Sequence, residues 1–235
     1  MQKADLKVYE MSLKVFLIKD ISFDNSREAI CKLIDKSLLK ETNMKEFHEE
    51  NKFKMYTFNS FYPLEKDRIY KAGNIYTIVI RTIDENLVKY FKTYLVNEYT
   101  EEIKALTIQH RIIPKRVIEK IYTISPAIIK CENGYWKNNI TVDQYEKQLN
   151  TNLIKKFNAF FNTKINEDFQ LFNFIKFDNK YPIPCKYKNI KLLGDKVTLS
   201  IDSSKEAQQL AYLALGAGIA EMGARGYGFC NFKWI

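Results

Sequence analysis

The chain has 235 residues, of which 46% are hydrophobic and 28% are charged. This apolar share is enough to form a folded core, so it excludes an intrinsically disordered chain, and the length suits one large domain or two smaller ones. The 37 Lys and Arg residues exceed the 28 Asp and Glu residues, and the net charge of +9 favours a polyanionic partner, either nucleic acid or an anionic membrane surface.

The positive charge is spread along the chain rather than gathered in a tail. Residues 1–120 hold 22 basic and 18 acidic side chains, and residues 121–235 hold 15 and 10. We therefore predict a positive surface that crosses both halves; the competing interpretation is a lysine-rich composition without a functional role. The N-terminus is charged where a signal peptide would be apolar, and the uncharged run at residues 207–220 is shorter than the ~20 apolar residues of a membrane span. We expect a cytoplasmic protein with no membrane partner.

Apolar spacing in the first half alternates between the period of a strand and the period of a helix. Residues 13–18 have strand character, and a capping-box pattern at residues 25–28 opens a helix. The buried stripe of that helix consists of Ile30, Leu33, Ile34 and Leu38. After a short polar segment we predict, in order, a strand at 54–58, a hairpin of 68–70 with 75–81 that turns at 72–74, a helix around 87–95 and a strand at 106–113.

The second half repeats the β-α-β-β-α-β order. The predicted elements are strands at 121–130, 169–177, 186–192, 196–201 and 229–234, with helices at 142–161 and 205–215. Two such units in tandem predict an α+β protein with two ferredoxin-like (RRM-like) domains, at residues 1–118 and 119–235. Pro114 and Pro126 flank this junction.

The cysteines and histidines limit the metal chemistry that the chain can support. No pair of the four cysteines has the CxxC spacing of a zinc site, and two histidines, His48 and His110, are too few for a multi-histidine site. No cluster of Asp and Glu suggests a two-magnesium site. We therefore expect neither a metal nor another cofactor.

Glycines concentrate near the C-terminus, where five of the eight lie within residues 216–228. A glycine-rich backbone can approach a ligand closely and direct N–H groups at phosphate oxygens. The segment is not a dinucleotide fingerprint, because the predicted helix precedes it, and the chain has no Gly-Lys-Ser/Thr of a P-loop. Residues 225–232 nearly match the RNP1 signature, but only three residues follow them, and the GxxG pattern at 223–226 has little specificity. A helix end followed by a turn is the alternative, but one glycine would suffice for it.

This segment, Gly218-Ile-Ala-Glu-Met-Gly-Ala-Arg-Gly226-Tyr-Gly228-Phe, resembles the C-terminal glycine-rich loop of the CRISPR-associated endoribonucleases that process precursor CRISPR RNA, in the repeat-associated mysterious protein superfamily. Ala220 and Ala224 replace a usual glycine and serine of that loop. The Ser-Pro segment at residues 120–126 and the segment at residues 47–58, which reads Phe-His and then Phe-Lys-Met-Tyr-Thr-Phe, resemble two further family segments in the same order. The resemblance spans most of the chain and implies the same tandem fold.

RNA carries its own nucleophile, so a ribonuclease need only activate a 2′-hydroxyl, protonate the leaving 5′-oxygen and stabilise the charged phosphorane. A histidine suits the proton transfers, and a lysine can stabilise the charge without a metal. The resemblance implies that His48 is the general base or acid and that Lys54 is the electrostatic stabiliser, with Lys52 as an alternative to Lys54. It also implies 2′,3′-cyclic phosphate and 5′-hydroxyl products. Some family members place a tyrosine on the first helix where this chain has Cys31, so another group, such as Tyr56, is a candidate helper.

The partner that the resemblance implies is CRISPR repeat RNA in precursor transcripts, bound by the basic surface and by Gly218, Arg225, Gly226 and Gly228. The leading hypothesis is a metal-independent endoribonuclease that generates guide crRNAs for antiviral defence. The alternatives are a catalytically inactive RNA-binding subunit of a CRISPR effector complex and a general single-strand RNA-binding protein. A homodimer and contacts with other effector subunits are left open, and so is the interpretation of His48, Lys54 and Arg225 as plain surface residues.

Overall fold

Four strands from the first half of the chain form an antiparallel sheet in the order β3-β5-β1-β6. The computed structural model describes residues 5–132, 134–187 and 190–235. Helix α1 (Phe23–Leu38) and helix α3 (Glu85–Tyr90), which continues into the π-helical turn η1 (Phe91–Leu95), share one hydrophobic core with this sheet. The predicted stripe of α1 is confirmed, because all four of its residues are buried. The strands are β1 (Tyr9–Leu17), β3 (Tyr56–Phe58), β5 (Ile75–Thr82) and β6 (Ile103–Ile112).

Two local predictions in this half were wrong. Residues 68–70 do not form a hairpin with β5; instead β4 (Ile69–Tyr70) pairs with β2 (Ile21–Ser22). Tyr70 packs edge to face against Phe61 and Tyr76, and burial of this aromatic cluster favours the observed pairing. The predicted capping box lies inside the first turn of α1, because the helix already begins at Phe23, after an N-cap residue that makes no side-chain cap.

The polar segment before β3 contains a helix that the sequence pattern did not reveal. This helix, α2, spans Thr42–Glu49, and none of its residues is fully buried. Its residues Met44 and Phe47 lie one helical turn apart and pack, partly buried, against the core, but two apolar residues in a polar segment are too few to predict a helix. Its position is important because it carries His48.

A second antiparallel sheet, in the order β12-β7-β11-β8, is built from the second half. Helix α4 (Val142–Phe161) has the predicted bounds, and Thr141 and Gln144 form a capping box at its start. Helix α5 (Lys205–Ala217) follows the last but one strand of the sheet, and the short 3-10 turns are η2 (Trp136–Asn138) and η3 (Gly223–Arg225). The strands are β7 (Ile118–Thr123), β8 (Phe172–Phe177), β11 (Val197–Ile201) and β12 (Cys230–Trp234).

Two strand predictions in this half also need correction. The strand predicted at residues 121–130 ends at Thr123, and the chain then turns towards Pro126, which cannot donate a ladder hydrogen bond. The strand predicted at residues 186–192 is divided between β9 (Ile183–Tyr187) and β10 (Ile190–Gly194), which form a separate two-stranded sheet. Residues 188 and 189 of that prediction lie outside the described residues.

The two sheets have the same topology. Counted along the chain within each half, the fourth strand lies beside the first, then the third, then the second. With a helix after the first strand and another after the third, this is the ferredoxin-like arrangement, so the predicted tandem α+β fold is confirmed. The chain passes from one sheet to the other between Ile112 and Ile118, and the predicted boundary after residue 118 lies at the first residue of β7.

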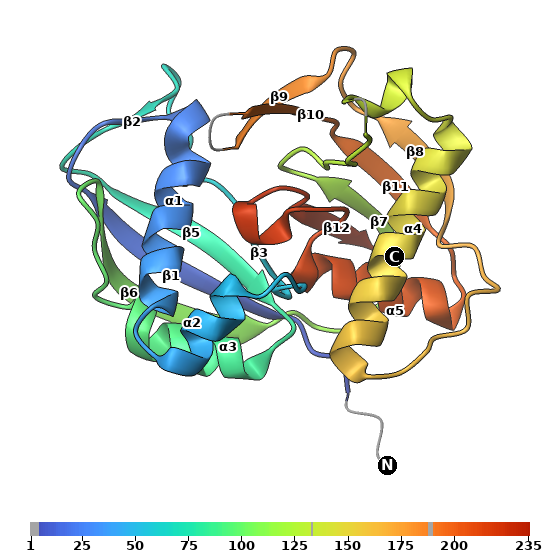
Figure 1. Ribbon diagram of the computed structural model, residues 1–235, viewed down its shortest axis with the longest axis horizontal. Helices are drawn as coiled ribbons and strands as arrows, with labels where there is room; N and C mark the ends of the chain where they lie inside the picture. The colour runs from blue at the N-terminus through green and yellow to red at the C-terminus, as the bar shows by residue number, and fades with distance from the viewer. Residues whose placement is uncertain (1–4, 133, 188–189) are drawn as a thin grey trace.

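The two halves pack closely against each other. Arg81 on β5 is only 5% exposed; it forms an ion pair with Glu10 at 2.7 Å and donates hydrogen bonds to the Cys230 carbonyl and the Asn231 side chain on β12. Helix α5 contacts β3 and β5 of the first sheet. Figure 1 shows α1 at the left of the view and α4 at the right, with the red glycine-rich segment around η3 between them.

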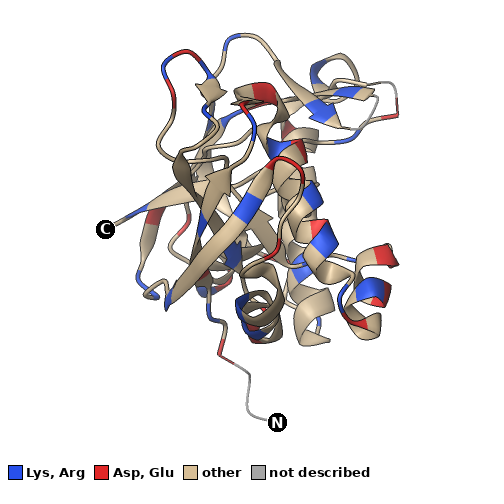
Figure 2. Cartoon of the chain, turned by 90° about the vertical axis from the view of Figure 1, so that its left-hand side faces the viewer, with Lys and Arg blue, Asp and Glu red and all other residues tan. Residues whose placement is uncertain are grey.

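Charged residues of both signs share the same elements. Figure 2 shows basic and acidic positions interspersed along the helices and strands of the first half. Several form i,i+4 pairs on the surface, such as Lys32 with Glu28 and Lys89 with Glu85. Within residues 5–132, 134–187 and 190–235, every helix is too short or too polar to cross a bilayer.

Candidate active site

Helix α2 and the segment after it carry a histidine and a lysine that line the same groove. His48 lies in the last turn of α2 and is partly exposed. The amine of Lys54 donates hydrogen bonds to the carbonyl oxygens of Phe47 and, at 2.7 Å, of Glu50. The last carbonyls of a helix have no partner within the helix, so Lys54 acts as a side-chain cap of α2. The structure thus holds the Lys54 amine against the backbone of the residue next to His48.

The environment of Lys54 disfavours its charged form. Burial lowers the pKa of Lys54; the nearby Glu50 carboxylate raises it, and the cations Arg225 and Lys52 lower it further. The amine also lies 4.6 Å from the centre of the Phe47 ring, which offers a cation–π contact. Lys52, the alternative, is largely exposed and pairs with Glu50 at 3.0 Å. Of the two lysines, Lys54 is the one with a fixed position.

A carboxylate that the sequence reasoning missed joins this pair to the glycine-rich segment. Asp35, on α1, accepts a hydrogen bond from Arg225 at 2.6 Å through Oδ2. Its other oxygen, Oδ1, lies 3.6 Å from Nδ1 of His48, is buried and has no hydrogen-bond partner among the described residues. The sequence contained a signal for Asp35. The resemblance places Cys31 at a position of the family's site, and Asp35 lies one helical turn after Cys31 and therefore on the same side of α1.

His48, Lys54 and Arg225 line one groove of about 930 Å³. The end of α2 and the following residues form one wall, and the C-terminal half of α4 and the glycine-rich segment form the other. Among the predicted residues, the structure brings His48, Lys54 and Arg225 to this groove, together with Lys52. In the part of the chain that the structure describes, no group of three or more His, Cys, Asp or Glu side chains is placed to hold a metal ion.

Tyr56, the candidate helper of His48, and Cys31, which stands where some family members have a tyrosine, have different surroundings. Tyr56 lines the groove but is only 2% exposed, and burial raises the pKa of its hydroxyl well above the usual range. The Cys31 thiol donates to the carbonyl of Ala224 at 4.0 Å, on the other side of the Asp35–Arg225 pair. Burial raises the pKa of the Cys31 thiol to about 12, so it stays protonated at neutral pH.

The three predicted glycines of the segment are buried, Gly218 and Gly226 against β3 of the first half and Gly228 against Ile219 of the second half. Their backbone N–H groups donate hydrogen bonds to carbonyl oxygens of the protein itself: Gly218 to Ala214, Gly226 to Gly223 and Gly228 to Pro126. Gly226 has a φ of +77°, and a Cβ there would lie 2.7 Å from the Phe58 ring of β3. Gly228 has a φ of +64°, and a Cβ there would overlap the carbonyl of Ile219. The sequence predicted that the glycine-rich segment makes a close contact. In the structure, the protein's own backbone and its strand β3 make contacts of this kind.

A buried lysine supports the same segment from the opposite side. Lys156 of α4 is 4% exposed and donates to the carbonyls of Ala217, Gly218 and Ala220 at 2.7–3.3 Å. Burial lowers its pKa to about 7. The sequence reasoning missed this residue; the signal was a lysine in the apolar stripe of α4, next to Phe157.

Comparison with known proteins identifies the family. Residues 111–232, slightly more than half of the chain, match the family model described as "CRISPR associated protein Cas6, C-terminal". The chain belongs to the Cas6 family. No curated protein sequence matches it.

Solved structures agree with the fold of this Cas6 family member. A structure described as "CRISPR associated protein Cas6" matches with a TM-score of 0.67 and 19% identity over 96% of this chain and 99% of that one. "An RAMP protein binding different RNA substrates" matches with a TM-score of 0.71, 14% identity and the same coverage. Cas6 of Thermus thermophilus matches with a TM-score of 0.62 and 13% identity over 98% and 100% of the two chains. The tandem ferredoxin-like architecture is thus shared along whole chains despite low sequence identity.

Proposed function

We propose that this Cas6 family member is an endoribonuclease that cuts CRISPR repeat RNA in precursor transcripts without a metal ion. Family membership supports the substrate class. The observation that carries the chemistry is the groove lined by His48, Lys54 and Arg225, with the Asp35 carboxylate in contact with His48 and Arg225. The positive net charge is consistent with a polyanionic substrate.

The proposed reaction is a transesterification within the RNA. The 2′-oxygen before the scissile phosphate attacks the phosphorus, so a P–O2′ bond forms and the P–O5′ bond breaks. The 2′-hydroxyl proton goes to a general base, and the departing 5′-oxygen takes a proton from a general acid. The products are a 2′,3′-cyclic phosphate and a 5′-hydroxyl end. His48 performs one of these two proton transfers, as general base or as general acid.

Asp35 supports this role as a positioning residue. A small rotation of the His48 imidazole would let its Nδ1–H donate to Oδ1 of Asp35, the buried oxygen that lacks a donor. That hydrogen bond fixes the tautomer of the imidazole and leaves Nε2 for the RNA. The other oxygen of Asp35 already holds Arg225, so one carboxylate orients two groups of the groove.

Lys54 and the glycine-rich segment contribute charge and shape. An ammonium group has three N–H donors. Two of the Lys54 donors bond to the carbonyls of Phe47 and Glu50, which leaves the third for a phosphate oxygen. There it stabilises the charge that develops on the phosphorane. Arg225 contacts an RNA phosphate or base, while Gly218, Gly226 and Gly228 set the backbone path that presents it.

Cleavage of repeat RNA in EDTA tests this function. We expect the wild-type protein to give a 2′,3′-cyclic phosphate and a 5′-hydroxyl end, His48→Ala to lose at least 100-fold in rate, and RNA with a 2′-deoxynucleotide before the scissile phosphate to stay intact. His110→Ala is the matched control, because His110 lies on β6 and does not line the groove. A requirement for magnesium, or equal rates for both histidine variants, would contradict the proposal.

The second candidate function is an RNA-binding subunit that does not cut. Cys31, at the position where some relatives carry a tyrosine, favours it, because its thiol is buried against Ala224. Tight binding of repeat RNA that remains intact through long incubation, unchanged by His48→Ala, would establish this alternative.

A further inference from the structure

The outer face of α4 borders a second pocket, of about 440 Å³, beside the groove. Six residues of α4 line it, at the three- and four-residue spacing of one helix face, so they form a stripe roughly 16 Å long. The opposite face of α4 is buried in the core of the second half. The six residues are Gln144, Lys147, Gln148, Thr151, Asn152 and Lys155.

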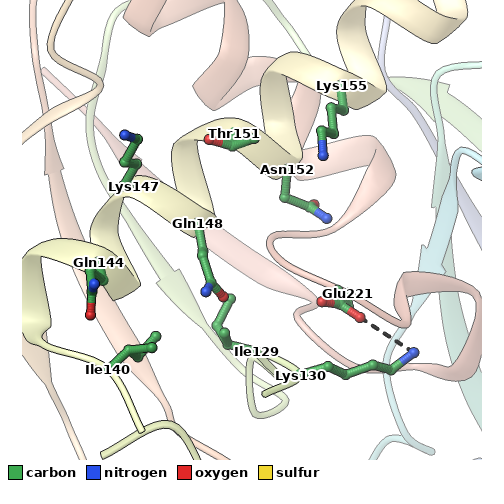
Figure 3. A pocket seen from close by; sticks show the side chains of 10 residues that line it. All are labelled: Ile129, Lys130, Ile140, Gln144, Lys147, Gln148, Thr151, Asn152, Lys155 and Glu221. Carbon is green, nitrogen blue, oxygen red and sulfur yellow. Dashed lines mark ion pairs between the residues drawn. The ribbon is translucent and has the colours of Figure 1, made fainter. Parts of the chain in front are cut away.

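The chemistry of this stripe is cationic and amide-rich. It contains no carboxylate, and within the described ranges Lys147 and Lys155 form no ion pair. Oδ1 of Asn152 is buried and finds no hydrogen-bond donor among the described residues. Figure 3 shows Gln148, Asn152 and Lys155 directed from α4 towards the far side of the pocket. A buried acceptor without a donor is unfavourable, and a ligand N–H or O–H would satisfy it.

The pocket adjoins the groove of His48. Lys130 and Glu221, which form an ion pair at 3.3 Å, line both spaces and mark the border between them. Beyond Lys155, the next turns of α4 line the groove itself through Ala159 and Phe160. A strand whose scissile phosphate lies in the groove can therefore extend along α4 into the pocket.

We propose that this pocket is a second RNA subsite, which binds a nucleotide flanking the scissile phosphate; the proposal rests on the proposed function. Lys147 and Lys155 contact the phosphates of the flanking strand. The amides of Gln148 and Asn152 hydrogen-bond to a base edge or a ribose hydroxyl, as proteins do with unstacked RNA bases. The pocket volume is within the range of cavities that hold small molecules, so it suits one nucleotide.

Binding of an uncleavable RNA tests the subsite separately from catalysis. The probe is the repeat RNA of the source organism with a 2′-deoxynucleotide before the scissile phosphate, and fluorescence anisotropy measures Kd over a series of salt concentrations. We expect the double variant Lys147→Ala/Lys155→Ala to bind about tenfold more weakly and to lower the salt slope by about 2. The matched control is Lys92→Ala/Lys205→Ala, two exposed lysines that line neither space, and it should bind like the wild type.

Shortened RNAs and single amide variants then locate the contact. Removing the nucleotides on one side of the scissile phosphate should abolish the difference between the double variant and the wild type, whereas removing those on the other side should preserve it. Gln148→Ala and Asn152→Ala should reduce discrimination between bases at one flanking position about tenfold, with the salt slope unchanged.

Two results separate the failure of this inference from the failure of the proposed function. In the first, the wild type cuts repeat RNA and His48→Ala does not, but Lys147→Ala/Lys155→Ala binds RNA as tightly as the control Lys92→Ala/Lys205→Ala. This result refutes the subsite and supports the proposed nuclease activity. If the α4 variants weaken binding of RNA that the wild type never cuts, the subsite stands and the nuclease is refuted.

Discussion

Lys156 predicts an unusual dependence of stability on pH. Its pKa falls from 10.5 to about 7 on folding because the side chain is buried. Between these two values the unfolded chain binds a proton at Lys156 that the folded protein does not, so stability rises as pH rises through this window. Each pH unit contributes about 1.4 kcal/mol, which gives roughly 2 kcal/mol between pH 7.5 and 9. Below about pH 6 the lysine is charged in both states and contributes no slope.

The variant Lys156→Met isolates this contribution. Methionine keeps most of the side-chain volume, but the carbonyls of Ala217, Gly218 and Ala220 lose a donor, so the stability difference at any single pH combines two opposing effects. The slope of the difference depends on the proton alone. Urea denaturation of both proteins from pH 5.5 to 9 measures it, with Lys155→Met, at the neighbouring exposed lysine, as the control that should show no slope. A wild-type advantage over Lys156→Met that is constant over this range would refute the reasoning.

Three further predictions concern the groove and its walls. Asp35→Asn should lower the single-turnover cleavage rate about 10- to 100-fold with little change in the Kd for uncleavable RNA, since it disturbs orientation rather than binding; an equal loss in Kd would contradict a positioning role. Gly226→Ala should destabilise the protein by about 2–4 kcal/mol in urea denaturation, because the new Cβ meets the Phe58 ring, while Gly73→Ala, with a similar φ in open space, should cost about 1–2 kcal/mol. Arg225→Ala should reduce the salt slope of RNA binding by about 1, and an unchanged slope would remove Arg225 from the RNA interface.

The fold was accessible from the sequence where burial imposes a period. Helix α4 combines a capping box with a continuous apolar stripe, and the structure has its predicted bounds. Helix α2 lies on the surface and packs only Met44 and Phe47 against the core, so its apolar pattern was too short to predict a helix. The pairing of β4 with β2 brings Tyr70 to Ile21, which lies far from it in the sequence, and a local pattern does not contain that information.

The site was accessible only in part, for a related reason. The sequence indicated that the glycines must approach something closely, but a ligand and the protein's own strand β3 both require the absence of a Cβ, and the pattern cannot distinguish them. Asp35 and Lys156 look like ordinary charged residues of their helices, and their partners come from a segment almost 200 and about 60 residues away. Their roles follow from tertiary packing.

The strand β3 links two parts of the candidate site. Lys54 lies just before it, and the glycine-rich segment that carries Arg225 rests on it through Thr57 and Phe58. A substitution that separated β3 from the glycine-rich segment would therefore move Lys54 and Arg225 apart without changing either residue. Under the proposed function, the alignment of the catalytic groups depends on how the two halves dock, and substitutions remote from any RNA can change the cleavage rate.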